Sequence, residues 1–200
     1  RFDWQLLKRL LRFGAPNGAQ FMLDMLGWSL FVLLVGRIGK EELAATNLAF
    51  QINSIVFMPM IGFATATSTL VGQRLGENKP NLAARATWSS MHLTFIYMVS
   101  IAAMYVLLPG PFIAPFAAKA DPVEFALIRP MAIIMLRYVA IYSVFDGVNL
   151  IFSAALKGAG DTFFVMFMTT SMSMCLMVIP TWLTLQAGIG TIWTSWTFIT

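Results

Sequence analysis

Apolar stretches of about 20 residues recur along the whole 200-residue chain. A transmembrane α-helix needs about 20 predominantly apolar residues to cross a hydrocarbon core of ~30 Å. The alternation over segments of ~10 residues that is typical of a membrane β-barrel is absent. Only 11% of the residues are charged, against about 25% in a soluble domain. The sequence therefore predicts an all-α fold, a polytopic transmembrane helical bundle.

Glycine, proline and polar residues divide the chain into predicted elements. We predict spans at about 14–35, 43–72, 82–108, 136–156 and 163–185, and a sixth that starts near 191 within the final segment 191–200. The chain begins with Arg1 and stops inside an apolar stretch that is too short to span a membrane. We therefore expect it to be a piece of a longer protein.

The segments between the spans give further expectations. Residues 1–13 form the pattern of a basic amphipathic helix at the membrane surface, and 123–135 that of an interfacial entry to the fourth span. We predict an irregular connection over 109–122 and a kink at Pro59. In "KGAGDT" (157–162), the glycines can end one helix and Asp161 can cap the next.

The basic residues indicate the orientation. Those on the side of the N-terminus are Arg1, Lys8, Arg9, Arg12, Arg74, Lys79, Arg85 and Lys157, which is eight, against five on the other side. Cytoplasmic loops carry the excess of Lys and Arg, so we expect a cytoplasmic N-terminus in the inner membrane. Because the net charge of +4 reports this orientation first, we expect no nucleic-acid partner.

Two carboxylates fall within the predicted spans. Asp24 is ten residues into the first span, about 15 Å from its cytoplasmic end. Asp146 is eleven residues before Lys157 at the end of the fourth, about 16–17 Å from the same face. A charge at this depth costs at least ~2.5–3.5 kcal/mol on insertion scales and should face the bundle interior or a water-filled cavity. The pair is therefore a candidate site for a cation or proton.

Neighbouring polar residues support this interpretation. Tyr142 and Asn149 lie on the helix face of Asp146, and Gln20 precedes Asp24 by one turn. Phenol and amide groups can supply neutral oxygens to a cation or orient a carboxylate. In the alternative interpretation, each aspartate only joins helices through buried hydrogen bonds.

Three further polar residues are weaker candidates. His92 lies at mid-depth of the third span, where it can relay protons or be a neutral histidine in a helix–helix hydrogen bond. Asn47 and Gln51 share one face of the second span and are candidates for the substrate path. Ordinary interhelical hydrogen bonds explain them equally well.

The remaining chemistry is sparse. A single histidine and a single cysteine, Cys175, provide no metal-ligand cluster and no nucleophile with a base. We therefore expect no enzyme, no cofactor, and no metal beyond Na⁺ at Asp24 and Asp146.

Three ordered stretches carry a family resemblance: "LLRFGAPNGAQFMLDMLGWSLFVLLVGRIG", "LAATNLAFQINSIVFMPMIGFATATSTLVGQRLG" and "FDGVNLIFSAALKGAGDT". Together they resemble the multidrug and toxic compound extrusion family of cation-coupled exporters. The resemblance implies one six-helix lobe, the C-terminal one, of a twelve-helix transporter with two lobes. It also implies that Asp24, Asp146 and Tyr142 bind the coupling ion, H⁺ or Na⁺.

The resemblance further implies an antiporter that exports organic cations or amphipathic drugs. Its partners would then be such a substrate, the lipid bilayer and the missing second lobe of the same chain. Two alternatives are a flippase for lipid-linked precursors and a membrane scaffold without transport. A flippase favours a strongly cationic cleft, and the sequence predicts no basic residue at the midplane.

Overall fold

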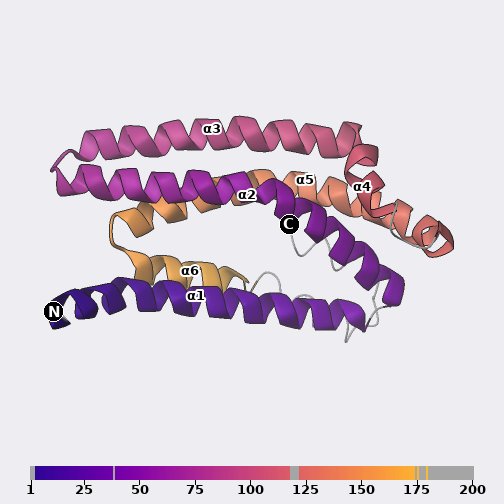
Figure 1. Cartoon of the computed structure of the whole chain (residues 1–200), viewed down its shortest axis with the longest axis horizontal. Coiled ribbons are helices and arrows are strands. Elements are labelled where there is room, and N and C mark those ends of the chain that lie inside the picture. The colour runs from indigo at the N-terminus through magenta and orange to yellow at the C-terminus, as the bar shows by residue number, and fades with distance from the viewer. Residues whose placement is uncertain (1–2, 38, 118–121, 174, 176–178, 180–200) are drawn as a thin grey trace.

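The computed structural model describes residues 3–37, 39–117, 122–173, 175 and 179. The helices are α1 Trp4–Gly36, α2 Lys40–Gly76, α3 Pro80–Leu107, α4 Pro109–Ala117, α5 Pro122–Gly158 and α6 Thr162–Ser173 (Figure 1). The predicted all-α class is confirmed. Among these described residues, four helices, α1, α2, α3 and α5, are long and apolar enough to cross a membrane.

Local sequence signals set several helix ends. The Asp3 carboxylate accepts from the backbone N–H of Gln5 at 2.9 Å and caps α1. Between α5 and α6, Gly160 has φ +95°, a conformation that favours glycine. The Asp161 carboxylate then accepts from the backbone N–H of Phe164 at 3.2 Å, which confirms the predicted break and cap.

The turn between α2 and α3 is tied by charge. Glu77 accepts from Lys79 at 3.1 Å and from Arg74 at 2.9 Å. These two hydrogen bonds lower the pKa of the exposed Glu77 carboxyl below its ordinary value. Asn78 in this turn has φ +55°, which asparagine tolerates better than most residues.

The structure differs from the prediction in the connections. The segment 109–122 is not irregular throughout, because α4 occupies Pro109–Ala117. Prolines at a helix start cost little, since the first turn has no use for their missing N–H groups. The predicted division between 123–135 and 136–156 is also absent, because α5 runs unbroken through Pro130. Likewise, α1 joins the predicted surface helix to the first span through Pro16.

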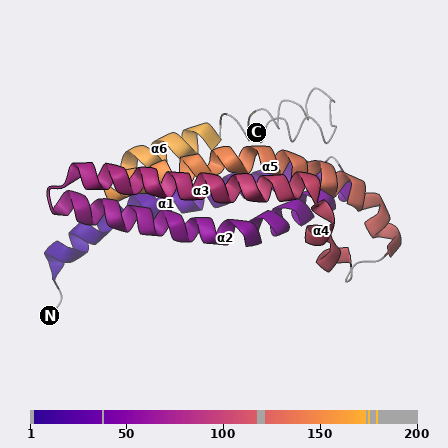
Figure 2. The same cartoon turned by 90° about the horizontal axis from the view of Figure 1, so that it is seen from above.

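The bend predicted for the second span is visible in α2. The helix changes direction along its length (Figures 1 and 2), and Pro59 lies in its interior. Proline removes one backbone hydrogen bond and its ring clashes with the preceding turn. Near this position the Tyr97 hydroxyl donates to the Val56 carbonyl at 2.8 Å. A side chain of α3 therefore supports the bent region of α2.

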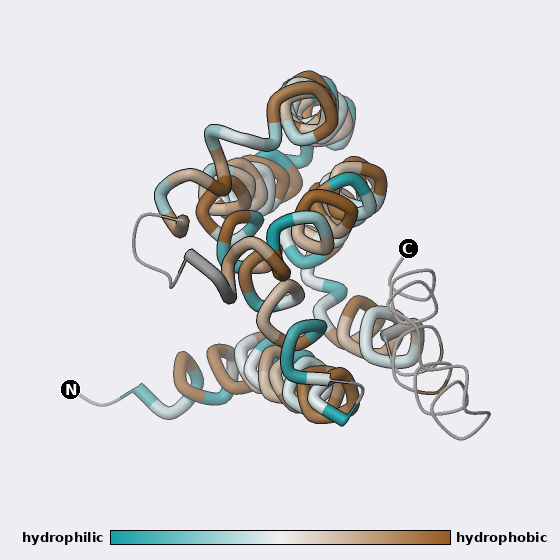
Figure 3. Tube along the Cα trace, turned by 90° about the vertical axis from the view of Figure 1, so that its right-hand side faces the viewer, coloured by the Kyte–Doolittle hydropathy of each residue, from teal (hydrophilic) through white to brown (hydrophobic). Residues whose placement is uncertain are grey.

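The helices associate in two groups. Helices α2, α3 and α5 pack closely together, and we call them the three-helix group; α1 packs mainly on α6, and we call them the α1/α6 pair. The end-on view in Figure 3 shows α1 set apart from the stacked helices. The sixth predicted span, 191–200, lies outside the described residues. Of the fifth predicted span, 163–185, the structure describes α6 up to Ser173 and then only residues 175 and 179.

Small residues allow the three-helix group to pack closely. A Cβ at Gly147 of α5 would lie 3.0 Å from Met60 of α2 and 3.2 Å from Met98 of α3. A Cβ at Gly158 would collide with the backbone carbonyl of Ser68. Without a hydrophobic effect between helices in lipid, such close packing is what holds them together.

The outward faces of the helices are apolar. Leu33 of α1, Ile55 of α2, Leu107 of α3 and Phe145 of α5 are each at least 65% exposed. Apolar residues occur around the outside of the bundle as well as within it (Figure 3). An apolar outer surface of this extent suits a lipid environment.

Candidate cation site and interhelical cleft

One face of α5 carries a stripe of polar residues. Asp146, Asn149, Ser153 and Lys157 follow one another at intervals of three, four and four residues, so they share a helix face. The Ser153 hydroxyl donates to the Asn149 side-chain oxygen at 3.3 Å. Asp146 and Lys157 are both partly buried. The stripe therefore carries an acid at one end and a base at the other.

A shorter polar stripe lies on α1. Asn17, Gln20 and Asp24 are spaced by three and four residues. Asp24 is partly buried, and the Gln20 amide interacts with its carboxylate. The Gln20 Oε1 atom is buried and accepts no hydrogen bond within the described part of the chain.

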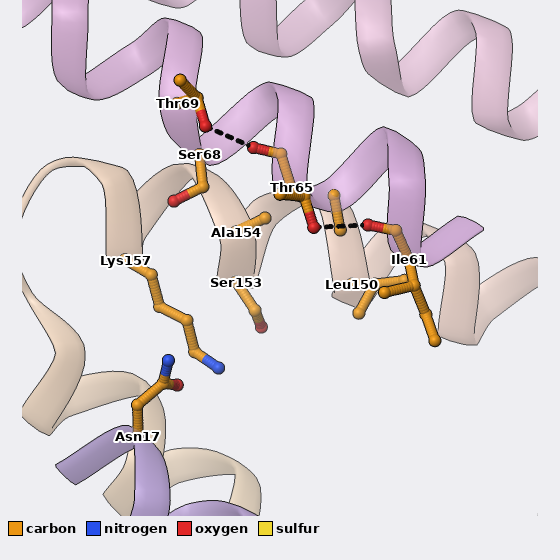
Figure 4. A pocket seen from close by; sticks show the side chains of 10 residues that line it. Asn17, Ile61, Thr65, Ser68, Thr69, Leu150, Ser153, Ala154 and Lys157 are labelled. Atoms are coloured by element: carbon orange, nitrogen blue, oxygen red, sulfur yellow. Dashed lines mark hydrogen bonds between the residues drawn. The ribbon is translucent and has the colours of Figure 1, made fainter. Parts of the chain in front are cut away.

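A cleft of about 430 Å³ separates α1 from the three-helix group. Its polar lining consists of Asn17 from α1, Thr65, Ser68 and Thr69 from α2, and Ser153 and Lys157 from α5. Figure 4 shows the Lys157 ammonium and the Asn17 amide pointing toward one another across this space. The Thr65 hydroxyl bonds to its own helix, at the Ile61 carbonyl 2.8 Å away. The cleft is thus lined by hydroxyls, an amide and one cation.

Lys157 is one of the residues that sequence reasoning missed at this site. It was predicted to lie in a loop on the cytoplasmic side, whereas it belongs to the last turn of α5 and interacts electrostatically with Asp24 of α1. Its spacing of four residues from Ser153 was a signal that could have placed it on the polar face.

Asp146 has its own partners on the side of the three-helix group. It interacts electrostatically with the Tyr142 phenol one turn earlier. The Tyr142 oxygen accepts a hydrogen bond of 3.0 Å from the Asn53 side chain of α2. Asn53 is only 8% exposed. The sequence prediction omitted it, although it lies four residues after the buried Ala49 and seven before the buried Met60.

The structure places the two aspartates on facing elements but records no direct interaction between them among the described residues. Helices α1 and α5 run in opposite directions (Figure 1), and Asn17 and Lys157 face one another (Figure 4). Asp24 lies seven residues beyond Asn17, about 10 Å, and Asp146 eleven before Lys157, about 16 Å. For straight helices the two carboxylates therefore lie about one turn apart in height.

The other predicted residues lie farther from this cleft. His92 is exposed on α3, and its Nδ1–H donates to the Trp88 carbonyl at 2.6 Å. Asn47 and Gln51 line a separate cavity of about 360 Å³ between α1 and α2, together with Met25 and Trp28. His92 is thus bonded within its own helix, while Asn47 and Gln51 face a mixed polar and aromatic space.

Long apolar helices, an apolar outer surface and partly buried charged residues on the helices that line a cleft define a multi-pass helical membrane protein. In a comparison with known protein families, the MatE family matches residues 16–183 of the chain. The chain belongs to the MatE family, and the resemblance noted in its sequence is confirmed.

Individual relatives agree with this assignment. The chain is 32% identical over 162 residues to a probable multidrug resistance protein NorM of Brucella suis biovar 1, which covers 81% of this chain and 34% of the relative. It is 31% identical over 157 residues to the protein of that name from Pseudomonas putida, covering 78% of this chain and 33% of the relative. The chain therefore spans about a third of the length of these curated relatives.

Solved structures show the same fold. A crystal structure of MATE in complex with MaL6 matches with a TM-score of 0.85 at 18% identity, over 100% of this chain and 44% of that one. An outward-facing multidrug resistance MATE family transporter matches with a TM-score of 0.81 at 19% identity, over 100% and 43%. The described helices thus have the arrangement of somewhat less than half of such a protein.

Proposed function

We propose that the full-length protein is a cation-coupled antiporter that exports organic cations or amphipathic drugs. The observation that carries this proposal is the pair of partly buried aspartates, Asp24 on α1 and Asp146 on α5, on two helices whose other polar residues line one interhelical cleft. The relatives named as probable multidrug resistance proteins support the export of drugs. Buried carboxylates in transmembrane helices are typical of ion pathways and proton relays.

Neutralisation of the two carboxylates couples cation binding to the conformational change. A carboxylate held away from water is costly while it is ionised and unpaired. Binding of H⁺ or Na⁺ at Asp24 and Asp146 removes most of that cost in whichever conformation brings the two side chains together. A ligand shifts a conformational equilibrium only by its different affinities for the two states, and this difference amounts to a few kcal/mol. The shift releases the substrate outward.

The neighbouring groups complete the site. The Tyr142 phenol, oriented by Asn53 at 3.0 Å, provides a neutral oxygen next to Asp146. Gln20 provides an amide next to Asp24, and Asn149 a second amide on the face of Asp146. Oxygen donors of this kind suit a hard cation such as Na⁺, and they equally stabilise a protonated carboxyl group through hydrogen bonds. The coupling ion is therefore H⁺ or Na⁺.

The cavity beside Asn47 and Gln51 is the proposed substrate path. Its wall includes Met25, Trp28 and Phe50, and methionine and aromatic side chains adapt to varied apolar ligands. Aromatic faces also attract organic cations. We place the protein in the cytoplasmic membrane with the N-terminus of this segment in the cytoplasm, as the distribution of Lys and Arg indicates.

The alternatives have less support. A flippase for lipid-linked phosphates requires several cations, and Lys157 is the one basic residue that lines the described cavities. The Lys157 ammonium group also interacts electrostatically with the Asp24 carboxylate. A scaffold without transport requires no particular arrangement of charges and predicts that both aspartates are dispensable. An enzyme requires a nucleophile and a base, which the sequence does not offer.

Efflux from proteoliposomes tests the proposal. The full-length protein is reconstituted, loaded with a fluorescent organic cation, and energised by an imposed pH gradient or an imposed Na⁺ gradient. We expect one gradient to drive efflux, and Asp24→Asn and Asp146→Asn each to abolish it while the protein stays monodisperse in detergent. Ser100→Ala serves as the control, because the exposed Ser100 hydroxyl of α3 bonds to the Ile96 carbonyl of its own helix at 2.7 Å and Ser100 lines neither the cleft nor the proposed substrate path. Normal efflux by both aspartate variants would exclude this mechanism.

A further inference from the structure

A second cavity continues the interhelical cleft near the N-terminal end of α1, and we call it the terminal cavity. It has a volume of about 480 Å³ and shares Asn17, Ser68 and Lys157 with the cleft. The rest of its lining consists of Leu6, Leu10, Phe13 and Gly14 of α1 and Thr162 of α6. The terminal cavity therefore combines polar residues from four helices with an apolar wall made by α1.

The polar residues of the terminal cavity are hydrogen-bond donors without partners. Within the part of the chain that the structure describes, no hydrogen bond is made by four of its side chains: Asn17, Ser68, Lys157 and Thr162. Ser68 differs in this from Thr65 and Thr69, whose hydroxyls bond to carbonyls of their own helix at 2.8 and 2.9 Å. Ser68, Lys157 and Thr162 are also at least partly buried, where an unpaired polar group is costly. The four donors thus suit a ligand with several acceptor atoms.

The charge in this lining favours an anion. Lysine binds phosphate groups as a point charge, and hydroxyl and amide groups donate to the phosphate oxygens. Two carboxylates lie nearby on the chain. Asp161 accepts from the Phe164 backbone N–H at 3.2 Å, and Asp24 lies seven residues beyond Asn17, about 10 Å along α1. Neither forms a close ion pair with Lys157 among the described residues, so the ammonium group is free to bind one phosphate.

The apolar wall indicates what else the ligand carries. Leu6, Leu10 and Phe13 are spaced by four and three residues, so they share one face of α1. Their side chains are 63%, 70% and 41% exposed. A soluble phosphate makes no use of such a surface, whereas the acyl chain of a phospholipid is stabilised by covering it.

The position of the terminal cavity in the bundle agrees with a lipid ligand. The start of α1, the turn between α2 and α3 and the turn between α5 and α6 lie at the same end of the molecule (Figures 1 and 2). The basic residues Lys8, Arg12, Arg74 and Lys79 belong to these segments. Their excess predicts that this end is cytoplasmic. Basic pockets between transmembrane helices on that side of a membrane bind acidic lipid headgroups.

We propose that the terminal cavity binds one anionic phospholipid. The Lys157 ammonium and the Ser68 and Thr162 hydroxyls hold its phosphate group, and an acyl chain lies along Leu6 and Leu10. The bound lipid bridges α1 to the ends of α2, α5 and α6 at the membrane surface. The proposal concerns binding alone and does not depend on the proposed transport function.

Native mass spectrometry of the full-length protein in detergent tests the headgroup contact. The probes are dioleoyl phosphatidylglycerol and dioleoyl phosphatidylcholine, which have the same acyl chains and differ in net charge. We expect one phosphatidylglycerol to bind more tightly than phosphatidylcholine, and Lys157→Gln to weaken its binding about fivefold. Lys157→Arg should retain it, because the charge is kept. Lys8→Gln is the matched control, since it removes an exposed positive charge of α1 outside the cavity.

Two further arms of the experiment identify the ligand as a lipid. Leu10→Ser removes apolar contact from the wall at an exposed position, and we expect it to weaken phosphatidylglycerol binding severalfold. Inorganic phosphate at millimolar concentration should not displace the bound lipid, because it gains nothing from the apolar wall.

Several results would overturn the proposal. Equal losses in Lys157→Gln and Lys8→Gln would show a general attraction to surface charge, and equal binding of the two lipids would show that the headgroup charge is not read. Displacement by inorganic phosphate, with normal binding by Leu10→Ser, would reassign the cavity to a soluble phosphate. If Lys157→Gln does not fold, Ser68→Ala combined with Thr162→Val removes two donors and keeps the charge. We expect weaker binding by this double variant, and unchanged binding would contradict the site.

Discussion

At the scale of single residues, the chemistry depends on how each polar side chain is held. Asp146 stands beside Tyr142, whose phenol oxygen is fixed by the Asn53 amide. Asn53 is almost fully buried, so its hydrogen-bonding groups depend on partners inside the protein. This contact joins α2 to α5 at the level of the proposed ion site. It links the orientation of an ion-binding oxygen to the packing of the three-helix group.

Tyr142→Phe should therefore weaken both stability and transport. Removing the phenol oxygen leaves the buried Asn53 amide without its recorded acceptor, which costs about 1 kcal/mol in a membrane protein. We expect a lower free energy of unfolding in denaturant, and a higher cation concentration for half-maximal efflux. Adding Asn53→Ala to Tyr142→Phe should cost little more than Tyr142→Phe alone. Fully additive losses from the two substitutions would contradict this coupling.

At the scale of helices, two devices shape the bundle. Pro59 bends α2, and the Tyr97 hydroxyl of α3 bonds to the Val56 carbonyl beside the bend at 2.8 Å. Glycines then let α5 approach its neighbours, with Gly147 beside Met60 and Gly158 against the backbone of Ser68. Because Lys157 directly precedes Gly158, this close approach also fixes where the ammonium group enters the cleft.

Two alanine substitutions compare these positions. Gly158→Ala places a methyl group against the Ser68 carbonyl, which the backbone cannot easily move aside. Overpacking of this kind costs about 1–3 kcal/mol, and we expect a clearly lower thermal midpoint in detergent. Gly62→Ala in α2 meets nothing within 4 Å and should leave the midpoint unchanged or raise it slightly. Equal midpoints for the two variants would show that the close contact at Gly158 is unimportant.

The sequence was most informative about the elements themselves. Hydrophobic stretches indicated the long helices, and "KGAGDT" indicated the break that Gly160 and Asp161 produce. The prediction was wrong where it divided α1 after residue 13, made 109–122 irregular and divided α5 after residue 135. Helices α1 and α5 continue through Pro16 and Pro130, because a proline is tolerated where neighbouring packing holds the helix together. Contacts between elements were harder to predict. The partners Asn53 and Lys157 depend on how helices lie side by side, which periodicity within one helix does not encode.

At the scale of the whole molecule, the two helix groups matter most. The α1/α6 pair carries Asp24, and the three-helix group carries Asp146, with the hydroxyl-lined cleft between α1 and that group. A site divided between two packed groups can respond to a bound cation by moving one group against the other, since packed groups move more easily as units than by internal deformation. The chain covers 34% of its NorM relative from Brucella suis, so the proposed transport has to be measured on the full-length protein.

The central claim is that Asp24 and Asp146 bind one cation jointly, and counting bound cations tests it most directly. The purified full-length protein is titrated with ²²Na⁺ at alkaline pH, and its proton uptake is followed in a parallel acid titration. We predict that Asp24→Asn and Asp146→Asn each lose the same single cation, and that the double variant loses no more than either alone. Losses that add up in the double variant, or binding that neither substitution changes, would contradict the account.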